Sequence, residues 1–511
     1  MSQALNTIAL TPAAPIFNEI PYTWRVPGNY MEVKQAVNEN ALLPFPARGL
    51  VMGQMYATGT AVAGTVYNIT SKPQAKALFG VGSIAADMCD AWLTANPYTP
   101  LDAIGIADVV GATAATGGVV IAGAATASGT LVFYFAGVRV PVGVAQGDTA
   151  AVVAANLYAA LLLQAGPGYK TIPQLTAAYI AASATVTWTA GNKGTLGNQI
   201  DVRLNANVGE QTPPGLTVTI NAMANGATDP AATIATALSS LVSTWYTDVA
   251  FPWTDATNWG VVGNWAAGRY AAMSKLDVQV YMSVSATYGT YLAFEPNNKF
   301  ITHLGVQNPM VPSWKTAAAL AAVCCFQTAQ KPSLQLKTVP LTGITAPAQA
   351  DQFTQPQREA ILQNGGSTYY ADANGNMYLE RVTTSYRIDP GNIPNSGWFD
   401  LQSVKVPTRV RYDWDAYIGL LYPRNNLAID GSIAAEYDPD VVTPLMLEGS
   451  WTGRSAVYEK NGWIQNSAVT AKNSSFSIDP NDGNRVNARQ QIQVMGNLIV
   501  LAGSLEFISN N

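Results

Sequence analysis

The chain has little histidine, cysteine or charge for its length of 511 residues. It contains one histidine and three cysteines, and charged residues make up 12% of it, about half the usual share in soluble proteins. Cys89, Cys324 and Cys325 are too few and too unevenly spaced for a disulfide framework or a zinc site. We therefore expect no metal, three buried structural thiols and a reducing compartment.

The single histidine leaves little room for acid–base catalysis. A Ser-His-Asp or Cys-His site would have to use His303, which lies in the apolar run of residues 300–306. A buried strand histidine explains that position more simply. We therefore expect no catalytic residue and no enzymatic activity.

Two glycine-rich stretches look like nucleotide loops but lack the context that such loops need. Residues 165–171 carry Tyr169 where a phosphate loop requires a glycine before its lysine. Residues 79–85 match the Gly-x-Gly-x-x-Ala form of a dinucleotide loop, but a helical pattern over residues 72–78 precedes them in place of a strand. We expect these glycines to end one helix, Ser83 to cap the next, and no cofactor to bind.

The charge pattern also argues against nucleic acid and membrane partners. The net charge is −5 and no Lys/Arg run occurs, whereas a nucleic-acid binder normally carries a basic face. Residues 109–138 are uncharged and long enough to span a bilayer, but glycines interrupt them, and strand patterns at residues 131–135 and 138–144 predict a hairpin. Residues 1–12 have no basic segment, so no signal peptide is expected.

Strand and helix patterns alternate in two separated parts of the chain. Apolar strand candidates occur at residues 50–54, 246–251, 276–284 and 300–305, and a helix is expected over residues 83–94. Strands that alternate with helices predict a mostly parallel sheet with crossover helices.

The sequence between these two parts consists of short β runs with few charges, which predicts an inserted domain. Residues 331–349 are rich in Pro, Thr and Ala and are interpreted as a linker. Residues 358–489 then hold 27 of the 59 charged residues, 12 basic and 15 acidic. The predicted domains are an N-terminal extended arm (1–35), a discontinuous α/β domain (36–110 plus 225–335), an inserted β-rich domain (111–224), a C-terminal α+β domain (336–495) and a C-terminal strand arm (496–511).

Two pairs of aspartates leave a carbohydrate-active hydrolase open as an alternative. Asp413 with Asp415, and Asp438 with Asp440, could supply the two carboxylates of glycoside hydrolysis, and the 12 tryptophans could stack on sugars. The members of each pair are only two residues apart, and residues 437–440 are typical of a turn.

A series of motifs runs along the chain from its opening to its last third. They lie at residues 17–30, 47–54, 79–88, 357–366, 368–386, 421–431, 442–444 and 479–487. Together they resemble the contractile tail sheath proteins of Mu-like phages. The resemblance covers nearly the whole chain and is least diagnostic in the inserted segment. Residues 449–466 depart from it, because glycine and polar residues stand where the family commonly has a longer acidic helix.

The resemblance implies a structural subunit of a contractile tail, with no cofactor. Many copies would stack as hexameric rings around a tail tube, and contraction would drive the tube through the host envelope during genome ejection. The implied partners are other copies of the chain, the tail tube protein, and baseplate and tail terminator proteins, with assembly in the host cytoplasm and residence in the virion tail. The implied fold is a multidomain α+β / α/β structure, with a mixed-sheet sheath core, an inserted β-rich domain and terminal strand-donating arms.

Both chain ends carry the two-residue alternation of an extended strand without an obvious partner nearby in sequence. The resemblance implies that both are donated to neighbouring subunits. The residues expected to make this intersubunit contact are Tyr22, Trp24, Val26, Tyr30, Met31, Val33, Leu498, Val500, Leu501, Leu505 and Phe507.

The charge of the last third leads to a second expectation about assembly. We expect it to face the tail tube through basic residues, with solvated surface charge as the alternative. The candidates are Arg387, Lys405, Arg409, Arg411 and Arg424. A non-catalytic surface or adhesion protein with β modules is the other competing class; it would carry a signal peptide, which is not found.

Overall fold

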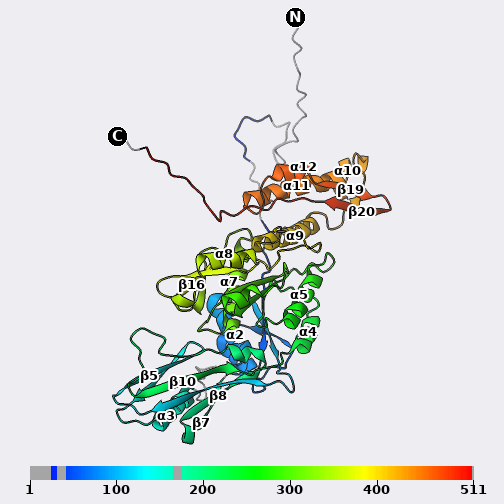
Figure 1. The fold of residues 1–511 in the computed structure, drawn as a ribbon. Coiled ribbons are helices and arrows are strands. Elements are labelled where there is room, and N and C mark those ends of the chain that lie inside the picture. Colours follow the sequence, from blue (N-terminus) through cyan, green and yellow to red (C-terminus); the bar gives the residue numbers. More distant parts are fainter. Residues whose placement is uncertain (1–24, 32–41, 165–174, 509–511) are drawn as a thin grey trace. The chain divides into compact units, whose positions relative to one another are not determined.

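The computed structural model describes residues 25–31, 42–164 and 175–508. Residues 1–43 and residues 44–511 are separate units, and each is considered by itself. The main body is the second unit (Figure 1).

A six-stranded sheet forms the centre of the main body, with strand order β13-β12-β11-β1-β3-β2. All neighbouring strands are parallel except β2, which runs antiparallel to β3. The expected mostly parallel sheet is therefore confirmed. The strands are β1 (Gly49–Gln54), β2 (Val66–Ile69), β3 (Leu101–Ile106), β11 (Asp248–Ala250), β12 (Gln279–Ser285) and β13 (Ile301–Val306).

Helices cover both faces of this sheet (Figure 1). On one face α2 packs against α7, and Ser83 caps α2 by accepting a hydrogen bond from the Ala86 amide, as expected. Gly49 has to be glycine, because a Cβ there would lie within 2.1 Å of the Trp92 indole. The helices are α1 (Lys72–Phe79), α2 (Ile84–Ala95), α4 (Ala231–Ser239), α5 (Ala256–Tyr270), α6 (Tyr288–Leu292) and α7 (Ser313–Gln330).

The segment between β3 and β11 builds two antiparallel sheets of its own, with strand orders β10-β4-β8-β7 and β6-β5-β9. The expected hairpin is confirmed as β5 and β6, and its turn residues Ala136 and Gly137 have φ of 48° and 83°, as a tight hairpin requires. The boundaries of an inserted domain remain a prediction. The elements are β4 (Ala114–Gly123), β5 (Gly129–Phe135), β6 (Val138–Val144), α3 (Ala150–Gln164), β7 (Leu175–Ile180), β8 (Thr185–Lys193), β9 (Val202–Leu204) and β10 (Leu216–Ala224), with short 3-10 helices at Ala181–Ser183 and Thr195–Gln199.

Part of the expected linker is a strand. Residues Pro340–Thr345 form β14 at the edge of a three-stranded sheet, paired with β16 (Asn376–Arg381), which in turn pairs with β15 (Thr368–Ala371). Proline is tolerated at the first residue of an edge strand, so the composition was misleading. The motif of residues 357–366 forms helix α8 (Gln355–Gln363), preceded by a 3-10 turn at Gln349–Asp351.

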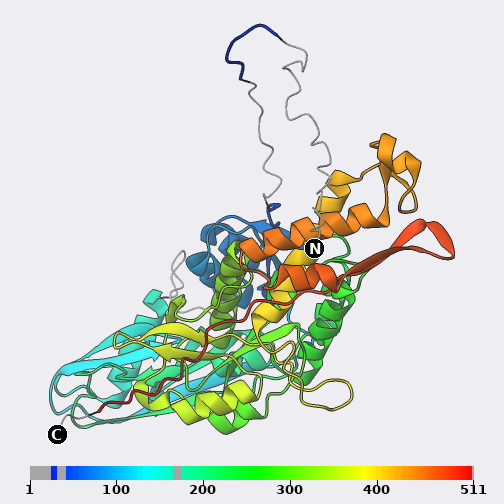
Figure 2. The same ribbon diagram turned by 90° about the horizontal axis from the view of Figure 1, so that it is seen from above.

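The last helices and strands of the chain form a layer, here called the terminal layer (Figures 1 and 2). Its core is aromatic: Trp414 packs edge-on against Trp451, and Tyr458 stacks on Trp463. The expected mixed α and β multidomain fold is thus confirmed. The elements are α9 (Leu401–Leu421), β17 (Asn426–Leu427), α10 (Ile433–Tyr437), β18 (Val441–Val442), α11 (Pro444–Lys460), α12 (Ser467–Lys472), β19 (Ser475–Asp479) and β20 (Asp482–Arg489).

Candidate assembly surfaces and the buried frame behind them

The described part of the N-terminal arm, residues 25–31, contains no helix or strand. Val26, Tyr30 and Met31 are all exposed, Met31 by 90%. The Tyr30 hydroxyl donates a hydrogen bond to the Val26 carbonyl at 3.3 Å. The other expected contact residues of this arm lie outside the described residues: Tyr22, Trp24 and Val33.

Most apolar side chains of the last described residues, 496–508, are exposed to solvent. They form no strand, and within the described part of the chain their backbone makes no hydrogen bond. The expected contact residues here are between 76% and 96% exposed: Leu498, Val500, Leu501, Leu505 and Phe507. An apolar extended segment without a partner is suited to pairing with another chain.

The hairpin of β19 and β20 offers free strand edges in the same layer. Each of these strands pairs only with the other among the described strands, in a register that sets Phe476 opposite Ala488 and Ile478 opposite Val486. A two-stranded hairpin is marginally stable alone. Its two outer edges are therefore candidate acceptors for added strands. Most of the motif at residues 479–487 lies in strand β20.

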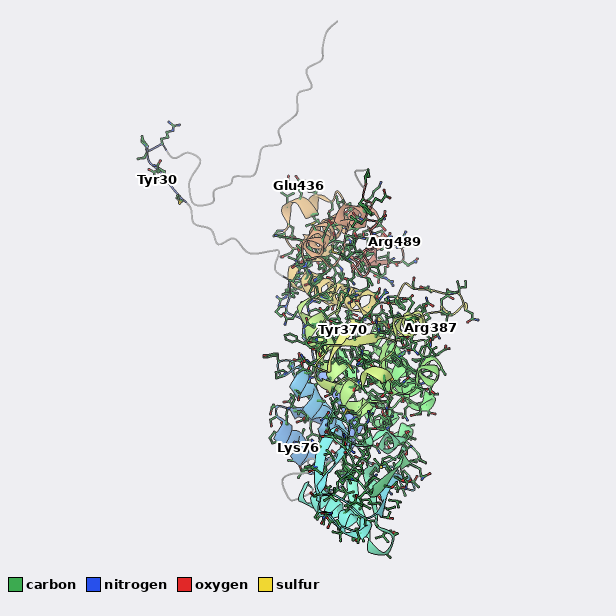
Figure 3. All side chains as sticks on the ribbon, turned by 60° about the vertical axis from the view of Figure 1, so that its left-hand side comes forward. Tyr30, Lys76, Tyr370, Arg387, Glu436 and Arg489 are labelled. Carbon is green, nitrogen blue, oxygen red and sulfur yellow. The ribbon has the colours of Figure 1, made fainter. Side chains whose placement is uncertain are left out.

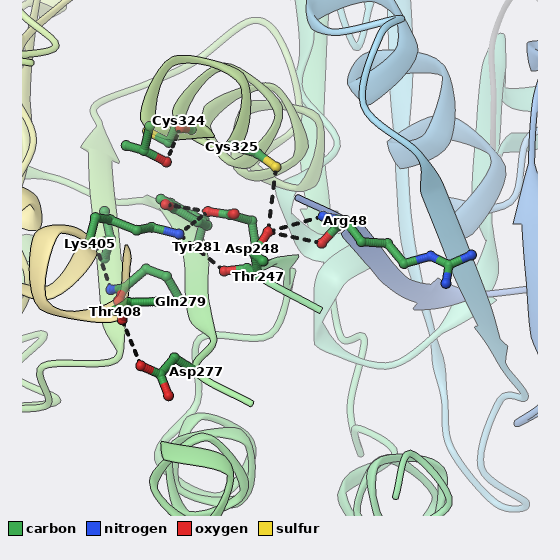
Figure 4. A network of polar contacts seen from close by, with 12 residues as sticks. Arg48, Thr247, Asp248, Asp277, Gln279, Tyr281, Cys324, Cys325, Lys405 and Thr408 are labelled. Carbon is green, nitrogen blue, oxygen red and sulfur yellow. Dashed lines mark hydrogen bonds and ion pairs between the residues drawn. The ribbon is translucent and has the colours of Figure 1, made fainter. Parts of the chain in front are cut away.

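Helix α9 is tied to the central sheet by a buried ion pair (Figure 4). The Lys405 ammonium lies 2.6 Å from the Asp248 carboxylate at the start of β11, and both side chains are more than nine-tenths buried. The Lys405 ammonium also donates to the Thr247 carbonyl, and the Tyr281 hydroxyl donates to Asp248 at 2.8 Å. Burial, together with the Asp248 charge, raises the pKa of Tyr281, so this hydroxyl stays a donor.

A second set of contacts continues along the same face of α9. The Thr408 hydroxyl donates to the Asp277 carboxylate at 2.8 Å, and the Arg411 guanidinium pairs with the same carboxylate. Farther along, Asp415 pairs with Lys275 at 2.7 Å on the surface. Helix α9 is therefore fixed to the start of β11 and to the loop that precedes β12.

The other side of α9 is fixed to α11 by a fully buried pair. The Arg454 guanidinium makes a two-pronged contact with the Asp413 carboxylate, with both N···O distances at 2.7 Å, and the Tyr458 hydroxyl donates to the same carboxylate at 2.8 Å. Two parallel charge-assisted bonds fix orientation as well as distance. Helix α9 thus joins the central sheet to the terminal layer that carries the hairpin.

These contacts correct the expectation for the basic residues. Lys405 and Arg409 are only 7% exposed, so they cannot meet a tube subunit. Arg409 lies over the Phe45 and Trp463 rings, and burial lowers its pKa to about 10. Arg411 is half-buried against Asp277. The sequence shows that these residues are basic, but it does not show that they make their contacts within their own subunit.

Arg424 and Arg387 are the two remaining basic candidates. Arg424 is exposed after the end of α9. Arg387 is half-buried, pairs with Glu295 at 3.1 Å and donates to Asn364. Figure 3 shows Arg387 in a loop at one side of the body, apart from Glu436 on α10. Their role at a tube remains a prediction.

The expected buried histidine and thiols are confirmed. His303 lies on β13, its Nδ1 is 2.8 Å from the Tyr291 hydroxyl, and burial lowers its pKa to about 3. Cys89, Cys324 and Cys325 are all buried, and burial raises the pKa of each thiol.

The aspartate pairs do not form the geometry of a glycosidase. Asp413 is buried against Arg454, whereas Asp415 faces solvent with Lys275. The Asp438 carboxylate accepts a hydrogen bond from the Asp440 amide at 2.9 Å, which is typical of a turn. Within the described ranges, no three His, Cys, Asp or Glu side chains are grouped to hold a metal. No described helix has the length and apolar character needed to cross a bilayer.

Comparison with known proteins identifies one relative along nearly the whole chain. No protein-family model matches. The Mu-like prophage FluMu tail sheath protein of Haemophilus influenzae is 28% identical over 497 residues, which is 96% of this chain and 99% of that protein. The resemblance to Mu-like tail sheath proteins is therefore confirmed.

Solved structures of sheath proteins are also similar to this chain. The sheath tail protein of Desulfitobacterium hafniense has 12% identity and a TM-score of 0.46, covering 92% of this chain and 100% of that one. The sheath tail protein of Listeria innocua has 11% identity and a TM-score of 0.48, covering 88% and 92%. The contracted sheath of an extracellular contractile injection system has 9% identity and a TM-score of 0.46, covering 94% and 98%.

Proposed function

We propose that this chain, which is similar from end to end to a Mu-like prophage tail sheath protein, is a structural subunit of a contractile phage tail sheath. The carrying observation is the length of that similarity, which leaves almost no part of either protein uncovered. The proposed activity is mechanical, and no catalysed reaction is part of it.

In this proposal many copies stack as hexameric rings around a tail tube in the virion tail, after assembly in the host cytoplasm. Contraction moves the subunits as rigid bodies into larger contacts and drives the tube through the host envelope. The tail tube protein, the baseplate and the tail terminator are the other proposed partners.

The terminal arms are proposed to join the subunits. Residues 22–33 and 498–508 would each add a strand to the hairpin of β19 and β20 in a neighbouring subunit. The free edges of that hairpin and the exposed apolar side chains of residues 498–508 support this pairing. Strands donated in this way keep rings connected while the bodies move.

The buried frame around α9 would make each body rigid. Two buried ion pairs, Lys405–Asp248 and Asp413–Arg454, connect the central sheet through α9 to the layer that carries the hairpin. A force applied to the hairpin by a neighbour's arm would then move the whole subunit. In this proposal Lys405 has a mechanical role inside the subunit, in place of the contact with the tube that was expected from the sequence.

The inserted segment, residues 111–224, is proposed to lie on the outside of the sheath. This assignment is supported by the sheet topology: the strands of the inserted segment form sheets of their own, and none of them belongs to the central sheet. Arg387 and Arg424 remain the proposed basic contacts to the tube.

Negative-stain electron microscopy of the purified protein tests the proposal. We expect striated or hollow tubes, formed by the chain alone or on purified tail tubes. Protein that stays monodisperse with and without purified tail tubes would contradict it.

A further inference from the structure

A groove of about 490 Å³ lies between α8 and β16, and the chain's own C-terminal arm forms one of its walls. Pro356 and Leu362 line it from α8, and Ile499 and Val500 line it from the arm. Figure 2 shows the segment after β20 running back across the body toward this region.

The root of this segment is fixed to the terminal layer. The Gln465 amide donates to the Gln493 carbonyl at 2.9 Å, and the Met495 amide donates to the Trp463 carbonyl at 3.1 Å. No backbone hydrogen bond follows Met495 within the described residues. The segment beyond this point is therefore held only by side-chain contacts, which it can give up without breaking a strand ladder.

Burial alternates along the next four residues. Asn497 and Ile499 are half-buried, whereas Leu498 and Val500 are 76% and 77% exposed. An extended segment with one face toward a surface has this two-residue period. Residues 501–508 are exposed throughout.

Charged residues of both signs line the groove: Lys337, Arg358, Glu359, Glu380 and Arg381. Arg358 pairs with Glu380 at 2.9 Å, and Arg381 pairs with Asp400 at 2.9 Å. Both guanidinium groups are therefore neutralised within the chain. Lys337 and Glu359 carry opposite charges, so the lining has no excess charge of one sign that would require a charged occupant. Residues 497–500 carry no charge and are tethered beside the groove.

We propose that residues 497–500 are a strap that closes into the groove between α8 and β16 in the free subunit and leaves it before the arm is donated. This inference rests on the proposed function of the arm. The strap competes with a neighbour's hairpin for the same extended segment, so it slows polymerisation of free subunits. Growth then depends on contacts that pull the strap out.

Cross-linking of the full chain tests the strap. The variant Leu362→Cys/Ile499→Cys is treated with a short bismaleimide, and the control is Leu362→Cys/Leu505→Cys, whose second cysteine lies beyond the strap. The three native thiols are buried, so we expect them to react slowly. We expect the first pair to form an intramolecular link in the soluble subunit at least tenfold faster than the control. Equal rates would overturn the strap, and this readout does not depend on whether the protein forms a sheath.

Polymerisation then tests the regulatory role. We expect linked subunits to form no tubes while the untreated double variant forms them, and tubes from linked subunits would overturn the proposal. Leu362→Glu, which disfavours the closed strap, should shorten the lag before polymerisation several-fold relative to Gln363→Glu on the adjacent exposed residue. An unchanged lag would also overturn it. If untreated protein forms no tubes, the proposed function fails, and the cross-linking rates still decide the strap.

Discussion

Replacing Lys405 should destabilise the subunit far more than replacing Lys275, a surface lysine that also pairs with an aspartate of α9. The side chains of Lys405 and Asp248 are 8% and 2% exposed, and their charged atoms are 2.6 Å apart. In Lys405→Met, the Asp248 carboxylate stays buried with the Tyr281 hydroxyl as a remaining donor. A buried charge without an opposite charge beside it lowers the free energy of unfolding.

The expected loss is about 3–5 kcal/mol in the free energy of unfolding, the range for breaking a buried pair by removing one partner. The double variant Lys405→Met/Asp248→Asn should recover most of it, because no unpaired charge remains. Lys275→Met is the matched control. Its pair with Asp415 has nearly the same distance, 2.7 Å, but the two side chains are 50% and 59% exposed, and such a pair is worth about 1 kcal/mol or less.

Urea unfolding, followed by far-UV circular dichroism and tryptophan fluorescence, measures these differences. Coincidence of the two signals checks that the body unfolds as one unit, which the frame around α9 requires. Equal losses for Lys405→Met and Lys275→Met would refute the claim that burial makes the first pair structural. A double variant no more stable than Lys405→Met would refute the explanation by an unpaired carboxylate.

Four further predictions follow from the same structure. The pKa of His303 is about 3 when folded and about 6.5 when unfolded, so protonation of the unfolded state lowers stability by about 1.4 kcal/mol in total between pH 7.5 and pH 5.5; urea unfolding at these two pH values should show this loss in the native chain and not in His303→Asn. The three cysteines should resist a thiol reagent until urea unfolds the protein, and fast labelling of the native chain would contradict their burial. Replacing residues 111–224 by a short Gly/Ser linker should leave tubes that still assemble, and a folded, soluble product without tubes would refute the external placement. Deleting residues 1–33 or 496–511 should give a folded monomer with an unchanged unfolding midpoint and no tubes, whereas full-length tubes from either would exclude arm donation.

Local patterns predicted four of the six strands of the central sheet, β1, β11, β12 and β13, because these are short apolar runs. Strands β2 and β3 were not predicted. The Ser83 cap and the hairpin turn at Ala136-Gly137 depend on nearby residues alone, and both are present. β14 was missed because the Pro- and Thr-rich composition around it resembles a linker, and an edge strand tolerates its one proline, Pro340, at the first residue.

The buried frame could not be predicted from sequence, because its partners are far apart along the chain. Lys405 meets Asp248 across 157 positions, and Arg454 meets Asp413 across 41. Charge in the last third was therefore interpreted as surface charge. For the C-terminal arm, the alternating pattern predicted a strand at residues 498–508. A strand requires a partner strand, and the described part of the chain supplies none to these residues.

A cryo-electron microscopy map of tubes assembled from the full chain tests the central claim most directly. The account predicts density for residues 498–508 as a strand paired with the β19–β20 hairpin of a neighbouring subunit. Both arms paired within their own subunit, or absent from every intersubunit contact, would contradict it.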